Sequence, residues 1–160
     1  MQGRYSIFAS LGNARQPFNR FLQMVDEAAE RAGMRTLLQT GHSTYRPKAA
    51  DAVDFVTRPE FEELVRAADS VIMHAGVGSV MTALQLGKIP IVVPRRLDHG
   101  EHIDNHQFQL AAELSRLGWC RVANGTDELL DALRTPPDAA SRNGNMSNQL
   151  MRNLVSDFIR

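Results

Sequence analysis

The chain has 160 residues, of which 43% are hydrophobic, and this is enough for one domain with a buried core. Its 18 basic residues balance 18 acidic residues, so charge favours neither nucleic acid nor an anionic membrane surface as a partner. The sequence opens without a signal peptide and contains no apolar stretch that could span a membrane, and its one cysteine, Cys120, indicates a reducing compartment. We therefore expect a cytoplasmic protein without a membrane span of its own.

Strands and helices are expected to alternate along most of the chain. Apolar runs typical of buried strands occur at 5–10, 36–39, 53–56, 70–73, 89–93 and 119–123. Helical stripes of apolar residues lie between them at 17–32, 61–68, 79–86 and 105–117, and a last strand-helix step follows at 126–134. This alternation predicts an α/β fold: a single Rossmann-like domain with a parallel sheet and helices on both faces.

The carboxyl-terminal part of the chain departs from this alternation. We expect the Rossmann-like domain to cover residues 1–134 and residues 135–149, which are polar and rich in Asn and Ser, to form a linker. Residues 150–160 predict an amphipathic helix because apolar side chains recur there at helical spacing. That helix either packs on the domain's own sheet or contacts a separate chain.

The segment from His74 to Ser79, with the sequence His-Ala-Gly-Val-Gly-Ser, carries the strongest functional signal. It follows the expected strand 70–73, and we expect a helix to open at Ser79, whose hydroxyl would cap the helix or donate to a ligand. Glycines let backbone N–H groups approach an anion, and the positive end of the helix dipole points to the same place. The pattern favours a phosphate or diphosphate site, with a tight packing turn as the alternative.

Two common nucleotide-binding motifs do not fit this segment. Met81 stands where a dinucleotide-binding fingerprint has its third glycine, and the Gly-Lys-Ser/Thr ending of a P-loop is absent from the sequence. The turns that follow the expected strands nevertheless meet at one edge of a parallel sheet, which is where ligands bind in such folds. These turns lie at 11–16, 41–46, 74–79 and 94–102.

A second polar cluster occupies residues 98–107. Carboxylates there suit the hydroxyl groups of a sugar, because each accepts directed hydrogen bonds. The cluster also holds side chains of the types that bind metals, namely His99, Glu101, His102 and His106. Because no complete set of four ligands with supporting hydrogen bonds is evident, we expect no metal. A solvated loop in which Asp104 caps the next helix is a third interpretation. The adjacent Arg95 and Arg96 are expected to be a solvated pair, or one of them is expected to face a phosphate of the ligand or a sugar carboxylate.

Several motifs of this chain resemble, in order and spacing, those of a known family. They are Leu11-Gly12, Gln16 to Arg20, Gly41 to Pro47, His74 to Ser79, Ala83 to Lys88, Pro94 to Arg96 and Glu101 to Gln107. Over residues 5–123 the chain resembles the C-terminal, donor-binding domain of family 28 glycosyltransferases, which have the GT-B fold. More narrowly, it resembles the stand-alone small subunits of split transferases, which act in exopolysaccharide and capsule synthesis or in the dolichol-pathway transfer of N-acetylglucosamine.

The resemblance implies that the chain binds a UDP-sugar as its substrate and uses no cofactor and no metal. The residues implied for the diphosphate are Gly12, His74, Gly76, Gly78, Ser79 and Val80. Thr82 is implied for the ribose. The residues implied for the donor sugar, or for anchoring the loop beside it, are Glu101, His102, Asn105 and Gln107.

The resemblance also implies a hexosyltransferase that is active only with a partner: the UDP-sugar-binding, catalytic-type subunit of a two-component inverting glycosyltransferase. The pair would transfer a hexose to a lipid-linked saccharide in surface-polysaccharide synthesis. A membrane-anchored acceptor-binding subunit would hold the chain at the inner face of the membrane. A non-catalytic accessory subunit that binds a nucleotide sugar, and a flavodoxin-like module that binds a small ligand, are the alternatives.

One departure from the family bears on activity. Asn13-Ala14-Arg15 stands where relatives usually carry Thr-His-Glu, so a loop histidine and acid are missing. The sequence identifies no catalytic base, and the catalytic residues are left unassigned.

Overall fold

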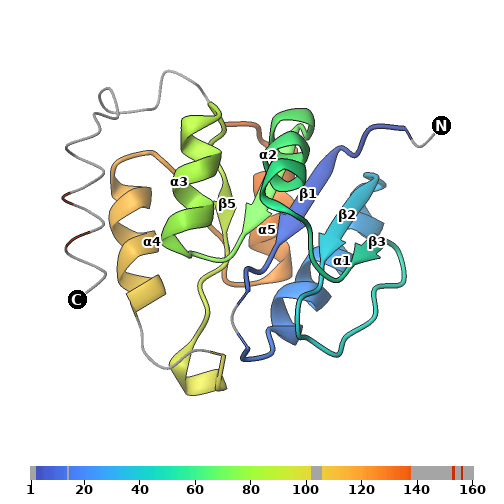
Figure 1. The fold of residues 1–160 in the computed structure, drawn as a ribbon, viewed down its shortest axis with the longest axis horizontal. Helices are drawn as coiled ribbons and strands as arrows, with labels where there is room; N and C mark the ends of the chain where they lie inside the picture. The colour runs from blue at the N-terminus through green and yellow to red at the C-terminus, as the bar shows by residue number, and fades with distance from the viewer. Residues whose placement is uncertain (1–2, 14, 102–105, 138–152, 154–155, 157–160) are drawn as a thin grey trace.

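A computed structural model describes residues 3–13, 15–101 and 106–137, together with Asn153 and Ser156. Six strands form one sheet in the order β3-β2-β1-β4-β5-β6, and each pair of neighbours is parallel (Figure 1). The strands are β1 (Ile7–Ser10), β2 (Thr36–Gln39), β3 (Asp51–Val53), β4 (Ser70–Met73), β5 (Ile91–Val92) and β6 (Arg121–Val122). The predicted α/β fold with a parallel sheet is confirmed.

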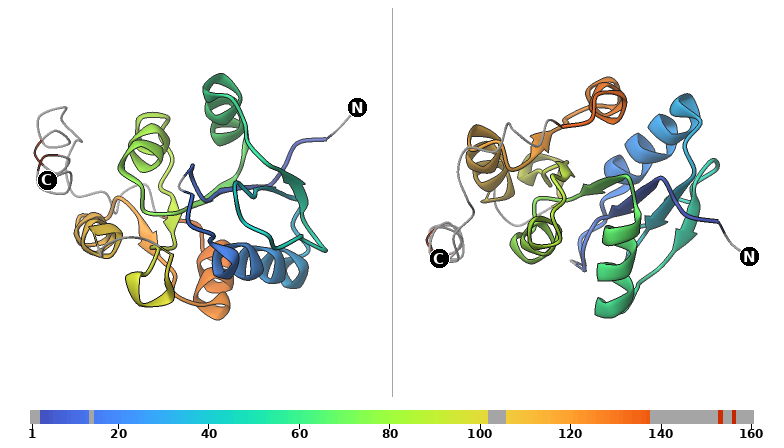
Figure 2. Two further views of the ribbon diagram at one scale, coloured as in Figure 1. Left: turned by 60° about the horizontal axis from the view of Figure 1, so that its bottom comes forward. Right: turned by 90° about the horizontal axis from the view of Figure 1, so that it is seen from above.

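Five α-helices and a short 3₁₀-helix lie between these strands or after the last of them. They are α1 (Asn19–Ala32), α2 (Arg58–Ala67), α3 (Val77–Gln85), α4 (His106–Arg116), α5 (Thr126–Arg134) and η1 (Leu97–His99). Helices α1 and α5 pack on each other on one side of the sheet, and α2 and α3 lie on the other side (Figure 2). The buried side chains of α4 belong to the same core cluster as those of α2 and α3. Helices therefore cover both faces, as the sequence predicted.

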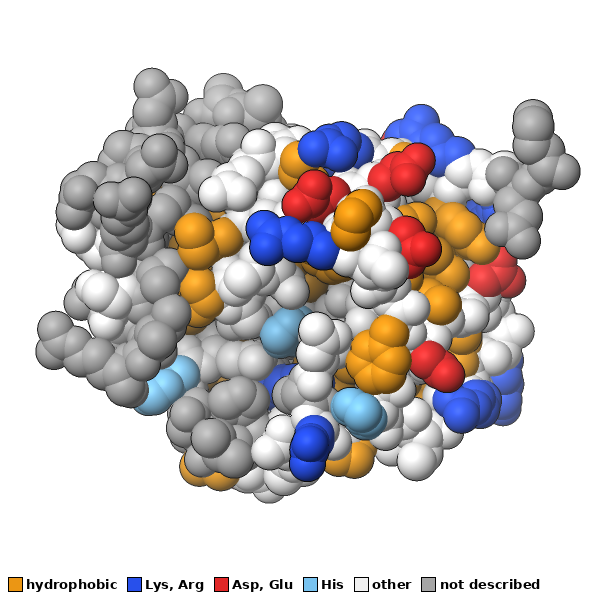
Figure 3. Space-filling view, in the orientation of Figure 1, with side chains coloured by type: hydrophobic (Ala, Val, Ile, Leu, Met, Phe, Trp, Pro, Cys, Tyr) orange, Lys and Arg blue, Asp and Glu red, His pale blue; other side chains and the backbone are white. Residues whose placement is uncertain are grey.

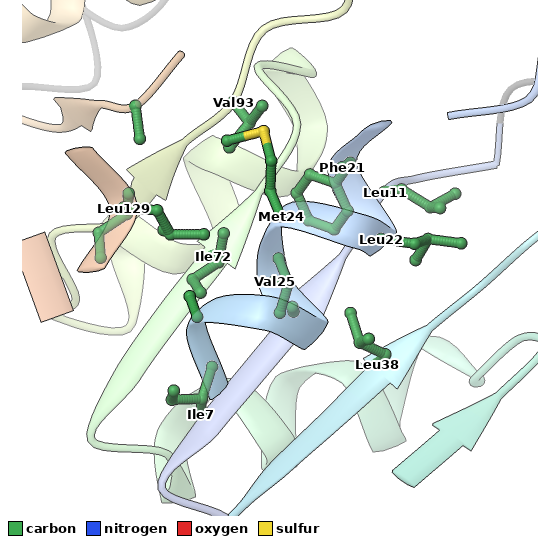
Figure 4. Packing of buried hydrophobic residues seen from close by; sticks show 14 of the residues in the cluster. Ile7, Leu11, Phe21, Leu22, Met24, Val25, Leu38, Ile72, Val93 and Leu129 are labelled. Atoms are coloured by element: carbon green, nitrogen blue, oxygen red, sulfur yellow. The ribbon is translucent and has the colours of Figure 1, made fainter. Parts of the chain in front are cut away.

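The core beneath α1 shows why the central strands β1 and β4 are buried. Phe21 and Val25 of α1 pack against Leu38 of β2 and Ile72 of β4, and all four side chains are 0% exposed (Figure 4). The cluster extends to Leu129 of α5. Burial of strands on both faces explains why β1 and β4 read as continuous apolar runs in the sequence. This packing fixes the carboxyl ends of the strands, from which the site is built.

Several boundaries differ from the sequence-based expectation. Strand β3 occupies Asp51–Val53 instead of 53–56, because its pairing with β2 ends where Gly41 donates to the carbonyl of Asp54. Helix α3 begins at Val77, two residues before the predicted start at Ser79. Within the described chain, no strand lies in 126–134, which holds only helix α5.

A buried acid on α1 holds the loop that follows β2. The carboxylate of Asp26, 4% exposed, accepts hydrogen bonds from the Tyr45 hydroxyl at 2.8 Å and from the backbone N–H groups of Lys48, Ala49 and Ala50 at 2.8–3.0 Å. Burial alone would raise the pKa of Asp26, but these four bonds outweigh burial and lower the pKa below its ordinary value. Burial of the phenol and its bond to Asp26 raise the pKa of Tyr45 to about 12. The carboxylate thereby fixes the loop to the helix.

The carboxyl-terminal predictions fall mostly outside the described residues. Of the predicted linker 135–149, only 135–137 are described, and they form no helix or strand. Of the predicted helix 150–160, Asn153 and Ser156 are described; both are helical, and the Ser156 hydroxyl donates to the Asn153 carbonyl at 2.9 Å. Among the helices of the described chain, none has the length and apolarity that crossing a membrane requires.

Candidate functional site

The loops at the carboxyl ends of the strands surround a cleft. In Figure 1 the loops that follow β1, β2 and β5 lie along the lower edge of the molecule. The cleft has a volume of about 440 Å³ and lies between the end of β1, the glycine turn after β4, and helices α2 and α3. Its lining residues are Ser10, Gly12, Asn13, Gln39, Val56, Arg58, Phe61, His74, Gly76, Gly78, Ser79 and Thr82.

Six of the residues that the sequence assigned to a UDP-sugar line this one cleft. They are Gly12, His74, Gly76, Gly78, Ser79 and Thr82. The structure thus brings the segment after β1 next to the turn after β4, although more than sixty residues separate them in the chain.

On the visible, coloured part of the molecular face in Figure 3, apolar, basic and acidic side chains are mixed, and no large patch of one charge appears there.

The glycine turn opens α3 two residues earlier than predicted. Gly76 is the N-cap residue and has an extended backbone, with φ −78° and ψ 132°. Because Val77 is the first helical residue, Ser79 lies inside the first turn and does not cap the helix, which corrects the predicted capping role. Apart from that of the N-cap residue, the N–H groups that have no acceptor within the helix by position are those of Val77, Gly78 and Ser79. These three donors stand at the positive end of the helix dipole.

Val80 differs from the other residues assigned to the diphosphate. Its backbone N–H donates to the Gly76 carbonyl at 3.0 Å and thereby makes the first hydrogen bond of α3. Its side chain is 1% exposed and belongs to the core. Val77, which the sequence analysis did not assign, supplies a donor position in its place.

His74 packs against two of the glycines. A Cβ atom at Gly12 would lie 2.4 Å from Nε2 of His74, and a Cβ atom at Gly76 would lie 2.1 Å from Cε1 of the same ring. Gly12 also has a positive φ of 80°, which side chains disfavour. By contrast, no described atom outside its own helix and chain neighbours lies within 4 Å of a Cβ placed on Gly78. Gly12 and Gly76 are therefore required by the histidine, whereas the space beside Gly78 is open.

Glu101 is buried in an ion pair. The carboxylate, with a residue exposure of 5%, accepts from Nε and Nη2 of Arg20 at 3.1 and 2.9 Å. It also accepts from the backbone N–H of Arg96 at 3.0 Å, and Nη2 of Arg20 donates in addition to the carbonyl of Pro94. These contacts join α1 to the segment that follows β5. The described cleft lining does not include Glu101.

Arg95 is neither solvated nor facing the cleft, which corrects both interpretations of the arginine pair for this residue. Its side chain is 0% exposed, and its guanidinium lies 4.7 Å over the ring of Phe18. The guanidinium donates to the carbonyls of Leu11, Gln16 and Glu101 at 2.8–3.0 Å. Burial lowers the pKa of Arg95 to about 10, while the charge of Glu101 acts in the opposite direction. Arg95 therefore ties the loop after β1 to the loop after β5.

Gln107, assigned to the donor sugar, lies behind the cleft. Its side chain oxygen accepts from the backbone N–H of Arg95 at 3.0 Å, and its amide nitrogen lies 3.2 Å from Nδ1 of His74. Gln107 is 7% exposed. The other two residues assigned to the sugar, His102 and Asn105, lie outside the described residues.

The sequence analysis missed one wall of the cleft. This wall holds Ser10, Asn13, Gln39, Val56, Arg58 and Phe61. The Ser10 hydroxyl donates to Gln39 at 2.8 Å, and Phe61 packs edge-on against Phe8 with ring centroids 5.6 Å apart. A sequence signal for part of this wall existed: Thr57 and Glu60 form a reciprocal capping box, which places the start of α2, and hence Arg58, at the cleft.

A metal site finds no support in the part of the chain that the structure describes. No group of three or more His, Cys, Asp or Glu side chains there is arranged to hold a metal ion. His102, one of the residues of the metal interpretation, lies outside that part.

The fold and the site together define a class of protein. A parallel sheet with helices on both faces, whose glycine turn opens a helix beside a cleft at the carboxyl edge, is a Rossmann-like domain. Residues 13–157 match the glycosyltransferase family 28 C-terminal domain, and the chain belongs to this family.

Curated relatives carry one name, UDP-N-acetylglucosamine transferase subunit ALG13. The chain is 44% identical to that of Yarrowia lipolytica over 62 residues, which is 39% of this chain and 30% of the relative. It is 34% identical to that of Cryptococcus neoformans over 105 residues, which is 62% of this chain and 50% of the relative. The human protein is 32% identical over 99 residues, which is 55% of this chain and 8% of the relative. The chain thus matches half or less of the length of these relatives.

Solved structures agree on the fold. The calicheamicin glycosyltransferase CalG4 superposes with a TM-score of 0.64 at 17% identity, over 98% of this chain and 39% of that chain. The solution structure of ALG13 superposes with a TM-score of 0.63 at 20% identity, over 98% of both chains. The predicted fold, the C-terminal half of a GT-B architecture, is therefore confirmed.

Proposed function

We propose that this chain is the UDP-sugar-binding subunit of a two-component glycosyltransferase, in which the cleft binds the donor. The observation that carries the proposal is the amino end of α3, where Gly76, Gly78 and Ser79 line the cleft beside the unfilled space at Gly78. Such an end binds the diphosphate of a nucleotide sugar without a metal. The names of the relatives support UDP-N-acetylglucosamine as the first donor to test.

The same donors have a chemical role in sugar transfer. In an inverting transfer the acceptor hydroxyl attacks the anomeric carbon, its proton passes to a base, and the bond from that carbon to the diphosphate oxygen breaks. Negative charge then accumulates on the departing UDP. Fixed N–H groups at residues 77–79 stabilise this charge more in the transition state than in the bound substrate, which is the condition for catalysis.

The rest of the nucleotide fits the cleft wall formed by α2 and α3. The Thr82 hydroxyl donates to the Gly78 carbonyl at 2.9 Å, so its oxygen is left to accept a hydrogen bond from the ribose. Val56 and Phe61 offer an apolar surface for the base, and Gln39 offers polar groups beside it.

The proposal for the donor sugar depends on which donors the carboxylate of Glu101 already accepts from. Oε1 accepts from Arg20 and from the Arg96 N–H, whereas Oε2 accepts from Arg20. We propose that the main role of Glu101 is to hold the loop after β5. Direct contact of the sugar with Glu101, His102, Asn105 or Gln107 remains a prediction.

The acceptor and the base are proposed to come from a partner. Among the described residues that line the cleft there is no carboxylate, and the histidine there is packed between two glycines. A transfer also requires the acceptor hydroxyl to be held against the donor. We propose that a membrane-anchored subunit supplies both, binds a lipid-linked saccharide and brings this chain to the inner face of the membrane. Surface-polysaccharide synthesis stays a prediction for the setting of this reaction.

The test combines ligand binding with transfer. Melting temperature is measured with UDP, UDP-N-acetylglucosamine, UDP-glucose and, as a control, ADP; a ligand at about 100 times its Kd adds roughly 2.7 kcal/mol to the free energy of unfolding. Transfer to a lipid-linked acceptor is then measured for the chain alone and with the partner's membranes. Stabilisation by UDP compounds and transfer only with the partner is the expected result. Failure to bind any UDP compound would leave a small-ligand module, and partner activity that persists without this chain would leave an accessory subunit.

A further inference from the structure

We propose that Gln107 is a positioning residue that fixes His74 as the neutral tautomer with its proton on Nε2. The two side chains are buried, come from different elements, and meet behind the cleft at 3.2 Å. The consequence for ligand binding rests on the proposed function, but the tautomer itself is a property of the protein alone.

The orientation of the Gln107 amide is determined by its other neighbour. The backbone N–H of Arg95 lies 3.0 Å from Oε1 of Gln107. A backbone N–H can only donate, so the amide oxygen has to face it. The amide NH₂ group is therefore the part of Gln107 that faces His74.

This orientation decides which nitrogen of His74 carries the proton. An amide NH₂ only donates, so Nδ1 of His74 has to accept and cannot be protonated. In the neutral ring the proton is then on Nε2. Formation of the imidazolium would set an Nδ1–H group against the N–H of Gln107, so this contact also disfavours the charged ring.

The contact is held rigidly. The guanidinium of Arg95 is fixed by two carbonyls of the loop after β1, which helps to fix the backbone N–H that orients the amide. On the other side, the backbone N–H of His74 donates to the Ser10 carbonyl at 3.2 Å, which extends the pairing of β4 with β1. Gln107 and His74 are 7% and 9% exposed, so a swap of either partner for water is disfavoured.

Nε2, the nitrogen that carries the proton, faces the glycine turn beside which the diphosphate is proposed to bind. Nε2 is the ring atom closest to a Cβ placed on Gly12, at 2.4 Å, and it lies 2.7 Å from one placed on Gly76. His74 also lines the cleft. In this tautomer the ring nitrogen beside the two glycines is a donor, whereas in the other tautomer the same nitrogen would carry a lone pair.

The experiment reads the tautomer directly by long-range ¹H–¹⁵N NMR of the imidazole rings, without ligand. His74→Gln identifies the His74 signals among those of the five histidines. The wild type is expected to show the Nε2–H tautomer. In Gln107→Glu one carboxylate oxygen still accepts from Arg95, while the other accepts from His74, so the proton is expected on Nδ1, alone or as the imidazolium. Backbone amide spectra show whether this variant is folded.

The outcomes separate this inference from the proposed function. A wild-type ring with Nδ1 protonated, or with both tautomers in exchange, overturns the inference whatever the variant does. An unchanged tautomer in folded Gln107→Glu overturns it as well. If the tautomer is as expected and UDP does not raise the melting temperature, the proposed function fails while the positioning role of Gln107 stands.

Discussion

His74 lies so close to Gly76 that a single Cβ atom at residue 76 would approach Cε1 of the ring to 2.1 Å. The group that excludes a side chain at Gly76 is thus the buried ring of His74. Gly78, two residues on, faces open space instead. The two glycines of the turn therefore have different physical reasons to be glycine, and substitutions separate these reasons.

Gly76→Ala is expected to destabilise the protein by about 1–3 kcal/mol, the usual range for overpacking a filled site. Urea unfolding measures the loss. The matched control is the same substitution in a His74→Ala background, where the ring has been removed and the methyl group has room. A loss that is as large in that background as in the wild type would show that the histidine is not what excludes a side chain at residue 76.

Gly78→Val is expected to leave the melting temperature of the ligand-free protein nearly unchanged, because no described atom outside its own helix and chain neighbours lies within 4 Å of a Cβ placed there. The branched side chain would nevertheless occupy the space in which a diphosphate approaches the first turn of α3. Stabilisation by UDP should therefore disappear. Full stabilisation by UDP in a folded Gly78→Val variant would remove the diphosphate from this end of the helix.

Glu101→Ala is expected to lower the free energy of unfolding by about 1.5–3 kcal/mol, since it leaves Arg20 without its charged acceptor. The substitution should change the affinities for UDP and for the intact UDP-sugar to a similar extent if the carboxylate mainly holds the loop. Isothermal titration with both ligands measures this. Glu113→Ala is the control, because Glu113 pairs with Arg116 at the surface and should matter little. A selective loss of the UDP-sugar would instead assign Glu101 to the sugar.

Much of the fold could be predicted because the alternation of apolar strands and helices is visible in the sequence without any knowledge of tertiary contacts. Strands β2 and β4 occupy the predicted residues, 36–39 and 70–73, since burial on both faces leaves a short apolar run in the sequence. The start of α3 was placed too late. Its N-cap is a glycine, and in the described structure no side chain caps it, so the serine that suggested a cap was misleading.

The cleft could be predicted only in part, for a related reason. Residues next to each other in the sequence, as in the turn 74–79, reveal a helix end. The environment of Arg95 depends on carbonyls of Leu11 and Gln16, which are far away in the chain, and a charged residue near a loop reads as solvated. In the same way, nothing local in the sequence places Gln107 against His74.

Asp26→Asn is expected to weaken the dependence of stability on acid. The pKa of Asp26 is lowered in the folded protein, so its contribution is fully present above the pKa of the unfolded chain, about 3.9, and is lost as the pH falls through the lower folded value. Wild-type stability should thus decline in this acidic window. An asparagine does not titrate, and its NH₂ group would oppose one of the N–H donors of residues 48–50, so the variant should be less stable at pH 7 and flatter below pH 4. Free energies of unfolding in urea at several pH values measure both effects.

Tyr45→Phe is the control, because it removes one hydrogen bond to the carboxylate and leaves the three backbone donors. It should keep most of the acid dependence, and an equally flat profile in Tyr45→Phe would show that the phenol, not the loop backbone, lowers the pKa of Asp26.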